Sequence, residues 1–213
     1  MIAEAGSNHD GQLDRARRLI DVAAEAGADA VKFQTFSADR IASQAAIGAT
    51  RLTDKFGRFG ETLFDFYKKL ELPADWHREL QAYAAEKGVT FLSTPFDEAA
   101  VDLLAALNVP AYKIASFELV HLPLLRHAAS KGKPVILSTG MATLGEIEEA
   151  LAAVTEAGND QVALLHCGIE YPVAMPDVHL ASMDTLRQAF SCPVGYSDHT
   201  LGVTVPIAAV ARG

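Results

Sequence analysis

The 213-residue chain has few of the residues that mark secreted, membrane-bound or nucleic-acid-binding proteins. Its two cysteines, Cys167 and Cys192, fit no metal-ligating or redox spacing, so a cytoplasmic location is expected. Basic residues are also scarce, since 18 Lys and Arg stand against 27 Asp and Glu and give a net charge of −9. Nucleic acids and anionic membranes need a basic surface on their partner. Neither is therefore expected as a partner here.

Long hydrophobic runs and an N-terminal targeting segment are absent as well. No run approaches the ~20 apolar residues of a membrane-spanning helix. The chain starts directly with Met1–Gly6, without the basic segment that opens a signal peptide. However, 50% of the residues are hydrophobic, which excludes a disordered chain and suffices for one full-sized core. We expect a single acidic globular domain over residues 1–213.

Short apolar runs alternate along the chain with Ala-rich amphipathic segments. The predicted strands are Met1–Ala5, Ala30–Gln34, Val89–Ser93, Ala111–Ala115, Val135–Ser138, Val162–His166 and Val194–Tyr196. All except the second are closely followed by a predicted helix, namely Leu13–Ala26, Asp97–Leu107, Leu122–Ser130, Leu144–Ala157, Met183–Phe190 and Val203–Ala211. Strands that alternate with helices pair in parallel through right-handed crossovers.

The number of these repeats predicts the fold. Seven or more units favour a TIM (β/α)₈ barrel over an open doubly wound sheet of five or six strands. No Gly-x-Gly-x-x-Gly motif follows any predicted strand, which argues against dinucleotide binding. A closed barrel takes about 250 residues. We therefore expect an α/β fold, a TIM barrel truncated before strand 8.

One stretch, from Phe36 to about Leu72, breaks the alternation. It holds three glycines, mixed charges and the aromatic patch Phe64–Tyr67. It is too long for an ordinary connection, and loops of this length are commonly lids or binding loops. The alternative is a peripheral insertion with a short helix of its own.

Polar and ionisable residues gather at the carboxyl ends of the predicted strands, where barrel active sites lie. Two of them, Lys32 and Lys113, sit inside apolar strands, and a buried lysine costs several kcal/mol unless it is paired. The pair therefore suggests a site for an anion such as phosphate or carboxylate. Glu4 is expected either as an ion partner of a lysine or as an anchor for substrate hydroxyls. The alternative is a structural Lys–Glu pair.

Histidines decide where a metal could bind. Four of them fall on predicted helices or loops and are expected at the surface or at helix caps: His77, His121, His127 and His179. Three follow strand ends: His9, His166 and His199. His199 could ligate a divalent metal through one ring nitrogen, but a metal needs further ligands and no second histidine stands nearby in sequence.

Seven motifs together resemble the sialic acid synthase family, over essentially the whole chain. They are Ile2–Gly11, Ala26–Thr35, Phe91–Phe96, Tyr112–Glu118, Leu137–Met141, His166–Pro172 and Gly195–Thr200. The resemblance implies a TIM barrel that joins C3 of phosphoenolpyruvate to the open-chain aldehyde of an N-acylated hexosamine. Water adds at C2, and phosphate leaves by C–O cleavage. It further implies a divalent metal (Mn²⁺, or Mg²⁺ or Co²⁺) and a homodimer in the full-length form.

The resemblance also assigns roles to residues of this chain. Positions that hold phosphoenolpyruvate are Lys113, Thr94, Ser116, Ser138 and Ser197. Positions around the sugar and the reacting centre are Glu4, Lys32, Gln34, Glu118 and Tyr171. His199 matches one of two metal-binding histidines. Catalytic roles are expected for Glu4, Lys32, Lys113, Glu118 and Tyr171.

Three departures from the family pattern bear on the substrate and the site. Gly168-Ile169 stands where the family usually has Thr and a small polar residue, and Ala115–Glu118 looks more like the pseudaminic-type synthases. The second metal-binding histidine and the C-terminal antifreeze-like domain of the family have no counterpart in the chain. Three alternatives stay open: a legionaminic or pseudaminic acid synthase with a diacetamido-deoxyhexose acceptor, another 3-deoxy-ulosonate synthase with a phosphorylated sugar, and a non-catalytic binding fragment.

Overall fold

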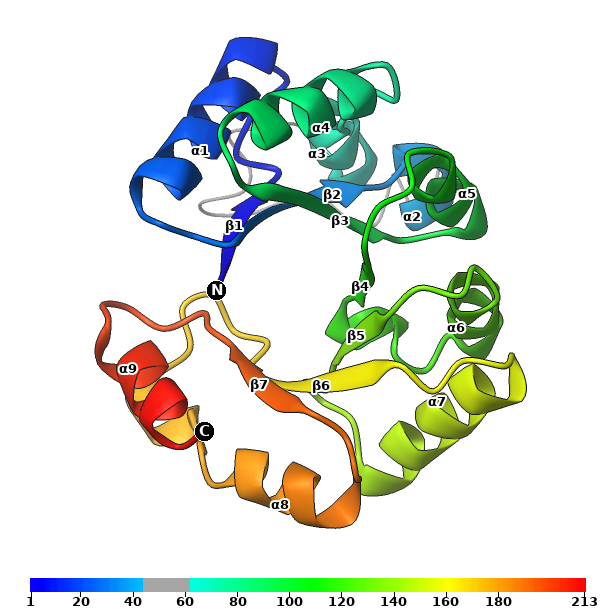
Figure 1. Cartoon of the computed structure of the whole chain (residues 1–213), viewed down its shortest axis with the longest axis vertical. Helices are drawn as coiled ribbons and strands as arrows, with labels where there is room; N and C mark the ends of the chain where they lie inside the picture. The colour runs from blue at the N-terminus through cyan, green and yellow to red at the C-terminus, as the bar shows by residue number, and fades with distance from the viewer. Residues whose placement is uncertain (44–61) are drawn as a thin grey trace. The chain divides into compact units, whose positions relative to one another are not determined.

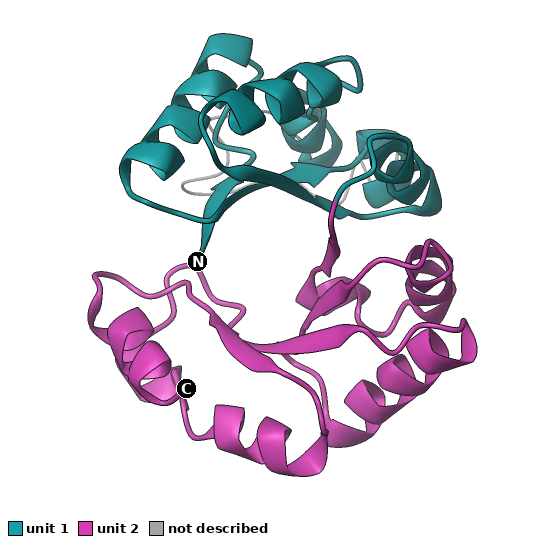
Figure 2. Cartoon of the chain, viewed as in Figure 1, with its two compact units in different colours: residues 1–109 teal, residues 110–213 magenta. Residues whose placement is uncertain are grey.

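A computed structural model of the chain describes residues 1–43 and 62–213 (Figure 1). The chain divides into two compact units, residues 1–109 and residues 110–213, which are coloured teal and magenta in Figure 2. Each unit contains a parallel β-sheet whose strands alternate with helices. The predicted α/β class is thereby confirmed, with seven strands among the described residues.

The first unit contains a three-stranded sheet in the order β1-β2-β3. Its strands are β1 (Ile2–Gly6), β2 (Ala30–Thr35) and β3 (Thr90–Pro95). Its helices are α1 (Leu13–Glu25), α2 (Ala38–Ile41), α3 (Leu63–Leu70), α4 (Trp76–Glu86) and α5 (Glu98–Ala106). All pairings in this sheet are parallel.

The hydrophobic core of the first unit forms between one face of this sheet and its helices. Phe33 of β2 and Phe91 of β3 are stacked with their ring centroids 5.7 Å apart. Ile20 of α1 and Leu80 of α4 are fully buried. Alternate residues of a strand point to opposite faces, so Val31 and Phe33 point toward the core and leave Lys32 and Gln34 on the other face.

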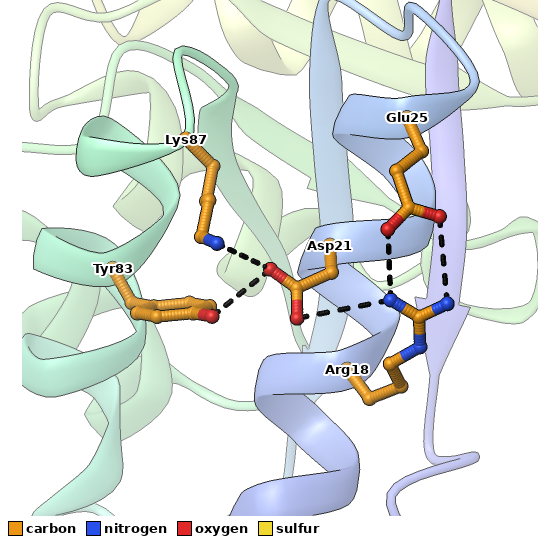
Figure 3. Close-up of polar contacts among 5 residues, drawn as sticks. All are labelled: Arg18, Asp21, Glu25, Tyr83 and Lys87. Atoms are coloured by element: carbon orange, nitrogen blue, oxygen red, sulfur yellow. Dashed lines mark hydrogen bonds and ion pairs between the residues drawn. The ribbon is translucent and has the colours of Figure 1, made fainter.

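Helices α1 and α4 lie side by side over the sheet and are joined by polar contacts at their surface (Figures 1 and 3). Asp21 of α1 accepts a hydrogen bond from the Tyr83 hydroxyl at 2.9 Å and forms an ion pair with Lys87 at 2.8 Å. These two contacts lower the pKa of Asp21. Arg17 of α1 also pairs with Glu79 of α4.

Helix α4 has no counterpart in the sequence-based prediction. Its buried side chains are His77, Leu80 and Ala84, at the i, i+3 and i+7 spacing of a helix that buries one face. A histidine at the first of these positions hides the pattern, because histidine is not counted as apolar.

The stretch that breaks the alternation is described only in part. Helix α3, from Leu63 to Leu70, begins at Thr62, whose hydroxyl accepts a hydrogen bond from the Asp65 backbone N–H. This agrees with an insertion that has a short helix of its own. The lid or binding-loop interpretation falls mainly on residues 44–61, which lie outside the described residues.

The second unit contains a four-stranded parallel sheet in the order β4-β5-β6-β7. Its strands are β4 (Tyr112–Ile114), β5 (Val135–Ser138), β6 (Val162–Cys167) and β7 (Val194–Ser197). Its α-helices are α6 (Leu122–Ala129), α7 (Leu144–Glu156), α8 (Ser182–Ala189) and α9 (Thr204–Ala211). Two 3₁₀ helices, η3 (Ser116–Glu118) and η4 (Met175–Asp177), follow β4 and β6.

Capping residues fix where two helices of the second unit begin. Thr143 and Glu146 form a capping box at α7, in which each side chain bonds the backbone N–H of the other residue. The His121 ring accepts a hydrogen bond from the Leu124 backbone N–H at 3.0 Å and so caps α6. The predicted capping role of a helix-side histidine is confirmed at His121. In the described residues, no helix is both long and apolar enough to cross a membrane.

Candidate active site

One face of the first sheet carries four of the predicted site residues. Glu4 of β1 is in register with Lys32 of β2, and Gln34 of β2 is in register with Thr94 of β3. Because Lys32 and Gln34 lie two residues apart on β2, they point to the same face. Glu4, Lys32, Gln34 and Thr94 therefore share the face opposite the hydrophobic core.

Glu4 and Lys32 form an ion pair across the two adjoining strands. The Lys32 side chain is only 11% exposed, whereas the Glu4 side chain is 42% exposed. The carboxylate thus compensates a buried ammonium group while staying accessible to solvent or to a ligand. Of the two roles expected for Glu4, the structure shows that of an ion partner.

The neighbouring pair on the same face is neutral. The Ser7 hydroxyl donates a hydrogen bond to Oε1 of Gln34 at 3.2 Å, which leaves the amide N–H groups of Gln34 to act as donors. Thr94 is buried, and its hydroxyl has no hydrogen-bond partner among the residues that the structure describes. Both side chains therefore keep capacity to bind a polar ligand.

The opposite face of the first sheet corrects one prediction. His77, expected at the surface or at a cap, is fully buried under the sheet. Its Nε2 lies 2.8 Å from the Thr35 hydroxyl, which lies 2.7 Å from the Ser93 hydroxyl, and its Nδ1 lies 3.0 Å from the Pro73 carbonyl oxygen. Burial lowers the pKa of His77. The buried ring thus has a hydrogen-bond partner at each nitrogen, and the Thr35 hydroxyl links it to the Ser93 hydroxyl.

His9 follows β1, as the sequence predicts, and is fully buried. Its Nδ1 accepts a hydrogen bond from the Gly11 backbone N–H at 3.1 Å, and its ring packs edge-on against Trp76. Nε2 has no hydrogen-bond partner within residues 1–43 and 62–213. Burial lowers the pKa of His9 as well, so this histidine favours its neutral form.

One face of the second sheet carries three further predicted residues. Lys113 of β4 is in register with Ile136 of β5, and Ser138 lies two residues further along β5. Leu165 of β6 is in register with Ser138 of β5 and with Gly195 of β7, and Ser197 lies two residues beyond Gly195. By the same alternation, Lys113, Ser138 and Ser197 point to one face. Lys113 is 7% and Ser138 is 1% exposed, so both groups are held in a poorly hydrated environment.

The hydroxyl groups of Ser116 and Ser138 differ in whether they have a hydrogen-bond partner. The Ser116 hydroxyl oxygen accepts a hydrogen bond from the Gly140 backbone N–H at 3.1 Å, and its own hydrogen is left to donate. The Ser138 hydroxyl has no partner among the described residues. A Cβ on Gly140 would lie 2.7 Å from Ile169 Cγ2 and 2.8 Å from Ser116 Oγ. Only glycine lets the segments after β4, β5 and β6 approach this closely.

Glu118 lies at the end of η3, directly after β4. Burial raises the pKa of its carboxyl, while the Glu118 backbone N–H, Lys113 and His121 act in the opposite direction. Its Oε2 has no hydrogen-bond partner in the described part of the chain. A carboxyl group that keeps its proton to higher pH than usual can act as a general acid.

The segments after β6 and β7 are joined through Tyr171 and His199. Their ring centroids lie 4.2 Å apart, and the Val173 backbone N–H donates a hydrogen bond to the His199 carbonyl oxygen at 2.9 Å. A Cβ on Gly168 would lie 2.5 Å from Val173 Cγ2. A larger residue at position 168 would therefore require the Val173 side chain to move.

The fit of a metal ion can be judged from the side chains around His199. Within the described residues, no group of three or more His, Cys, Asp or Glu side chains could hold a metal ion. Catalytic zinc sites and non-haem iron sites commonly have three protein ligands. The described residues therefore do not form a complete metal site around His199.

The predicted site residues thus fall into two groups, each within one unit. The first unit brings together Glu4, Lys32, Gln34 and Thr94 on one face of its sheet. The second unit places Lys113, Ser138 and Ser197 on one face of its sheet and Ser116, Glu118, Tyr171 and His199 in the segments that follow its strands. Two polar residues of the first unit have contacts that the sequence does not predict. Ser7 bonds Gln34, and His77 bonds Thr35 beneath the sheet.

Comparison with known proteins gives a consistent result. A model of the NeuB family matches residues 19–213. N,N'-diacetyllegionaminic acid synthase of Campylobacter jejuni is 46% identical over 215 aligned positions, and the synthase of the same name from Legionella pneumophila is 44% identical over 217. Both alignments cover 100% of this chain, but 64% and 61% of those proteins.

Solved structures agree with the predicted fold. The crystal structure of an N-acetylneuraminic acid synthetase from Leptospira borgpetersenii matches 100% of this chain and 69% of its own, with a TM-score of 0.85 and 36% identity. The match confirms the TIM-barrel class, since that structure is such a barrel. The chain spans about three fifths of the length of the curated relatives it matches.

Proposed function

The chain belongs to the NeuB family, and we propose that it carries the site of a synthase that condenses phosphoenolpyruvate with an N-acylated amino sugar. The products are a nine-carbon sialic-acid-like sugar and inorganic phosphate. The observation that carries the proposal is the face of the second sheet that holds a buried lysine, Lys113, together with the hydroxyls of Ser138 and Ser197.

This face suits phosphoenolpyruvate, which bears a phosphate dianion and a carboxylate. A cation held in a poorly hydrated environment attracts an anion far more strongly than an exposed cation does. Lys113 is proposed to bind the phosphate, with donated hydrogen bonds from the Ser138 and Ser197 hydroxyls. Ser116 adds a donor whose oxygen is already fixed by the Gly140 N–H. The same contacts would stabilise phosphate as it leaves.

Proton transfer is proposed for Glu118. Its burial raises its pKa, so a larger fraction of the carboxyl is protonated near neutral pH than in water. In the condensation, the aldehyde oxygen of the acceptor becomes a hydroxyl and must gain a proton. Glu118 Oε2 is the group of the second unit that we propose to supply it.

Acceptor binding is proposed for the polar face of the first sheet. The half-exposed carboxylate of Glu4 accepts hydrogen bonds from hydroxyls, and the Gln34 amide donates them. Lys32 keeps this face from carrying an uncompensated negative charge. Thr94 adds to this face a buried hydroxyl that has no hydrogen-bond partner among the described residues.

We propose a diacetamido-deoxyhexose as the first candidate acceptor and N-acetylmannosamine as the second. The two relatives at 46% and 44% identity are named for legionaminic acid. Apolar side chains on the segments after β4 and β6 support this order, since Phe117 is 59% and Ile169 is 37% exposed. A sugar in which a hydroxyl is replaced by hydrogen or an acetamido methyl group loses less on meeting such a surface.

The resemblance also implies a divalent metal ion, such as Mn²⁺, near His199. The described residues do not form a complete metal site, so they do not by themselves account for metal binding. Homodimer formation in the full-length protein and a cytoplasmic location likewise remain predictions of the sequence.

The test is an assay of phosphate release from phosphoenolpyruvate in buffer with Mn²⁺. Four acceptors are compared: the 2,4-diacetamido precursors of legionaminic acid and of pseudaminic acid, N-acetylmannosamine, and one phosphorylated sugar. We expect release with a diacetamido precursor and a slower release with N-acetylmannosamine. With ¹⁸O in the bridging position of phosphoenolpyruvate, the label should appear in the phosphate. Turnover only with the phosphorylated sugar would favour another 3-deoxy-ulosonate synthase, and binding without turnover would favour the non-catalytic fragment.

A further inference from the structure

We infer that the Cys167 thiol lines the anion-binding face of the second unit, where bound phosphoenolpyruvate shields it from alkylating agents. The site is thus one for soft electrophiles, in competition with the anionic substrate. The inference rests on the proposed function, because that function supplies the anion.

The position of Cys167 in the sheet carries the inference. Cys167 ends β6 and is in register with Ser197 of β7. It lies two residues beyond Leu165, which is in register with Ser138 of β5. Side chains two residues apart on a strand share a face. The thiol therefore stands on the same face as Ser138 and Ser197, and as Lys113 of β4.

An observation independent of the cysteine points to a ligand on this face. The Ser138 side chain is 1% exposed, and its hydroxyl has no hydrogen-bond partner in residues 1–43 and 62–213. A buried hydroxyl without a partner costs about 1–3 kcal/mol. A phosphate oxygen bound on this face would accept its hydrogen and remove that cost. Ser138 and Cys167 are on adjoining strands, so a ligand that reaches one is close to the other.

Cys167 is closely packed by the residues around it. Its thiol lies 3.2 Å from the Gly168 carbonyl oxygen, and its own carbonyl oxygen lies 2.9 Å from the place where a Cβ on Gly140 would be. Cys167 is 8% exposed. The segment after β5 thus packs closely against the end of β6.

The chain supplies its own control in Cys192. Cys192 precedes β7 and so lies at the amino ends of the parallel strands, whereas Cys167 lies at their carboxyl ends. Burial raises the pKa of the Cys192 thiol, which slows its alkylation. Both thiols are free, and they are the only cysteines in the chain. Each can therefore be followed separately in one preparation of the wild-type protein.

The test is alkylation by iodoacetamide, with peptide mass spectrometry to measure the rate at each cysteine. The thiolate sulfur attacks the methylene carbon, a C–S bond forms, iodide leaves and the thiol proton passes to solvent. We expect phosphoenolpyruvate at 10 times its Kd to slow the labelling of Cys167 about 10-fold, because only about one eleventh of the protein is then free of ligand. The rate at Cys192 should stay unchanged.

Calorimetry of phosphoenolpyruvate binding in the same preparation separates the two claims. If phosphoenolpyruvate binds and the Cys167 rate does not change, or if both cysteines slow equally, the inference is wrong while the proposed function stands. If phosphoenolpyruvate does not bind, the proposed function fails and the inference fails with it.

Size at position 167 gives a second test. Cys167→Met adds volume on the face and should raise the Kd for phosphoenolpyruvate about 10-fold, whereas the control Cys192→Met should bind as the wild type does. Wild-type affinity in a folded Cys167→Met protein would overturn the inference. If that variant does not fold, wild-type protein alkylated at Cys167 should lose phosphoenolpyruvate binding in proportion to the labelled fraction, and unchanged binding would overturn it equally.

Discussion

The two units each place a lysine on the face of a parallel sheet, but they surround it differently. In the first unit, the residue in register with Lys32 is Glu4, and the two side chains form an ion pair. In the second unit, the residue in register with Lys113 is the apolar Ile136, and the hydroxyls of Ser138 and Ser197 stand on the same face. One sheet therefore places a carboxylate in register with its lysine, and the other places hydroxyl groups on the same face as its lysine.

The difference teaches which sheet suits which part of a substrate. A compensated pair favours neutral groups that can both accept and donate hydrogen bonds, such as the hydroxyls of a sugar. A buried lysine that shares its face with hydroxyl groups favours a phosphate or carboxylate, since these anions accept hydrogen bonds from an ammonium group and from hydroxyls. Replacing each lysine in turn, and measuring which substrate binds less well, therefore tests the comparison directly.

The largest effect is expected from the two lysines. Lys113→Ala should raise the KM for phosphoenolpyruvate at least about 30-fold, because a hydrogen bond to a charged group contributes about 2 kcal/mol. Lys32→Ala should instead raise the KM for the acceptor. Initial-rate kinetics with both substrates varied measure this split, with Arg126→Ala as a control that removes an exposed cation of the second unit. If Lys32→Ala raised the KM for phosphoenolpyruvate and Lys113→Ala did not, Lys32 and not Lys113 would be the residue that binds phosphoenolpyruvate.

Gly140→Ala should be the most destabilising of the small substitutions, by about 1–3 kcal/mol. The added Cβ would lie within 2.9 Å of Ile169, Ser116 and the Cys167 carbonyl oxygen. Gly145→Ala is the matched control, because its nearest neighbour would be the Thr143 hydroxyl oxygen at 3.9 Å in the first turn of α7. Urea unfolding of the two variants compares them. Equal stability of both would show that the segment after β5 adapts to the methyl group.

The ion pair of the first unit should be asymmetric. Glu4→Gln leaves the ammonium group of Lys32, 11% exposed, without its carboxylate and should lower the free energy of unfolding by about 1–2 kcal/mol. Lys32→Met leaves a carboxylate that is 42% exposed and can be hydrated, so its effect should be smaller. Chemical denaturation of both variants measures the difference. A larger loss in Lys32→Met would contradict the burial argument.

The two units should respond to pH in opposite directions. Burial lowers the pKa of His77, so stability should fall as pH decreases below about 6.5, when the unfolded chain gains a proton that the native state resists. Burial raises the pKa of Glu118, so stability should fall as pH increases above about 4.3 toward its native pKa. Each pKa unit corresponds to about 1.4 kcal/mol.

His77→Gln and Glu118→Gln test these two contributions separately. His77→Gln should flatten the loss of stability between pH 7 and pH 5, and Glu118→Gln should flatten the loss between pH 4 and pH 7. Thermal unfolding of both variants and of the wild type across pH 4–8 gives the curves. Parallel curves for a variant and the wild type would mean that its side chain does not titrate differently in the two states.

The smallest effect is expected at the surface between α1 and α4 (Figure 3). Asp21→Asn keeps the shape of the side chain but removes the ion pair with Lys87. The unfolding midpoint should drop slightly at low salt and match the wild type at 1 M NaCl, because exposed ion pairs are screened. A salt-independent drop would point to the Tyr83 hydrogen bond as the stabilising contact instead.

The sequence predicts the strands well because each is a short apolar run bounded by Gly, Pro or polar residues. The predicted Val135–Ser138 is β5, and the predicted Val194–Tyr196 ends one residue before β7 does. Helix α4 is not predicted, since His77 stands at one of its three buried positions and removes the apolar spacing. Local pattern cannot show that Thr35 and Ser93 require a polar partner beneath the sheet.

The sequence predicts which residues belong to the candidate site, but it does not predict which of them lie next to each other. Strand ends predict that Lys32, Lys113 and Glu4 lie where ligands bind in a barrel. Register, which sequence alone does not give, shows that Glu4 faces Lys32 and that Cys167 stands with Ser138. The glycine at position 168 is likewise explained only by the contact with Val173.

Calorimetric titration of the wild-type chain with phosphoenolpyruvate, alone and with inorganic phosphate present, tests the central claim most directly. We expect one binding event per chain, weakened by inorganic phosphate, unaffected by Arg126→Ala and at least about 30-fold weaker in Lys113→Ala. Binding of wild-type affinity in Lys113→Ala, or binding that inorganic phosphate does not weaken, would contradict this.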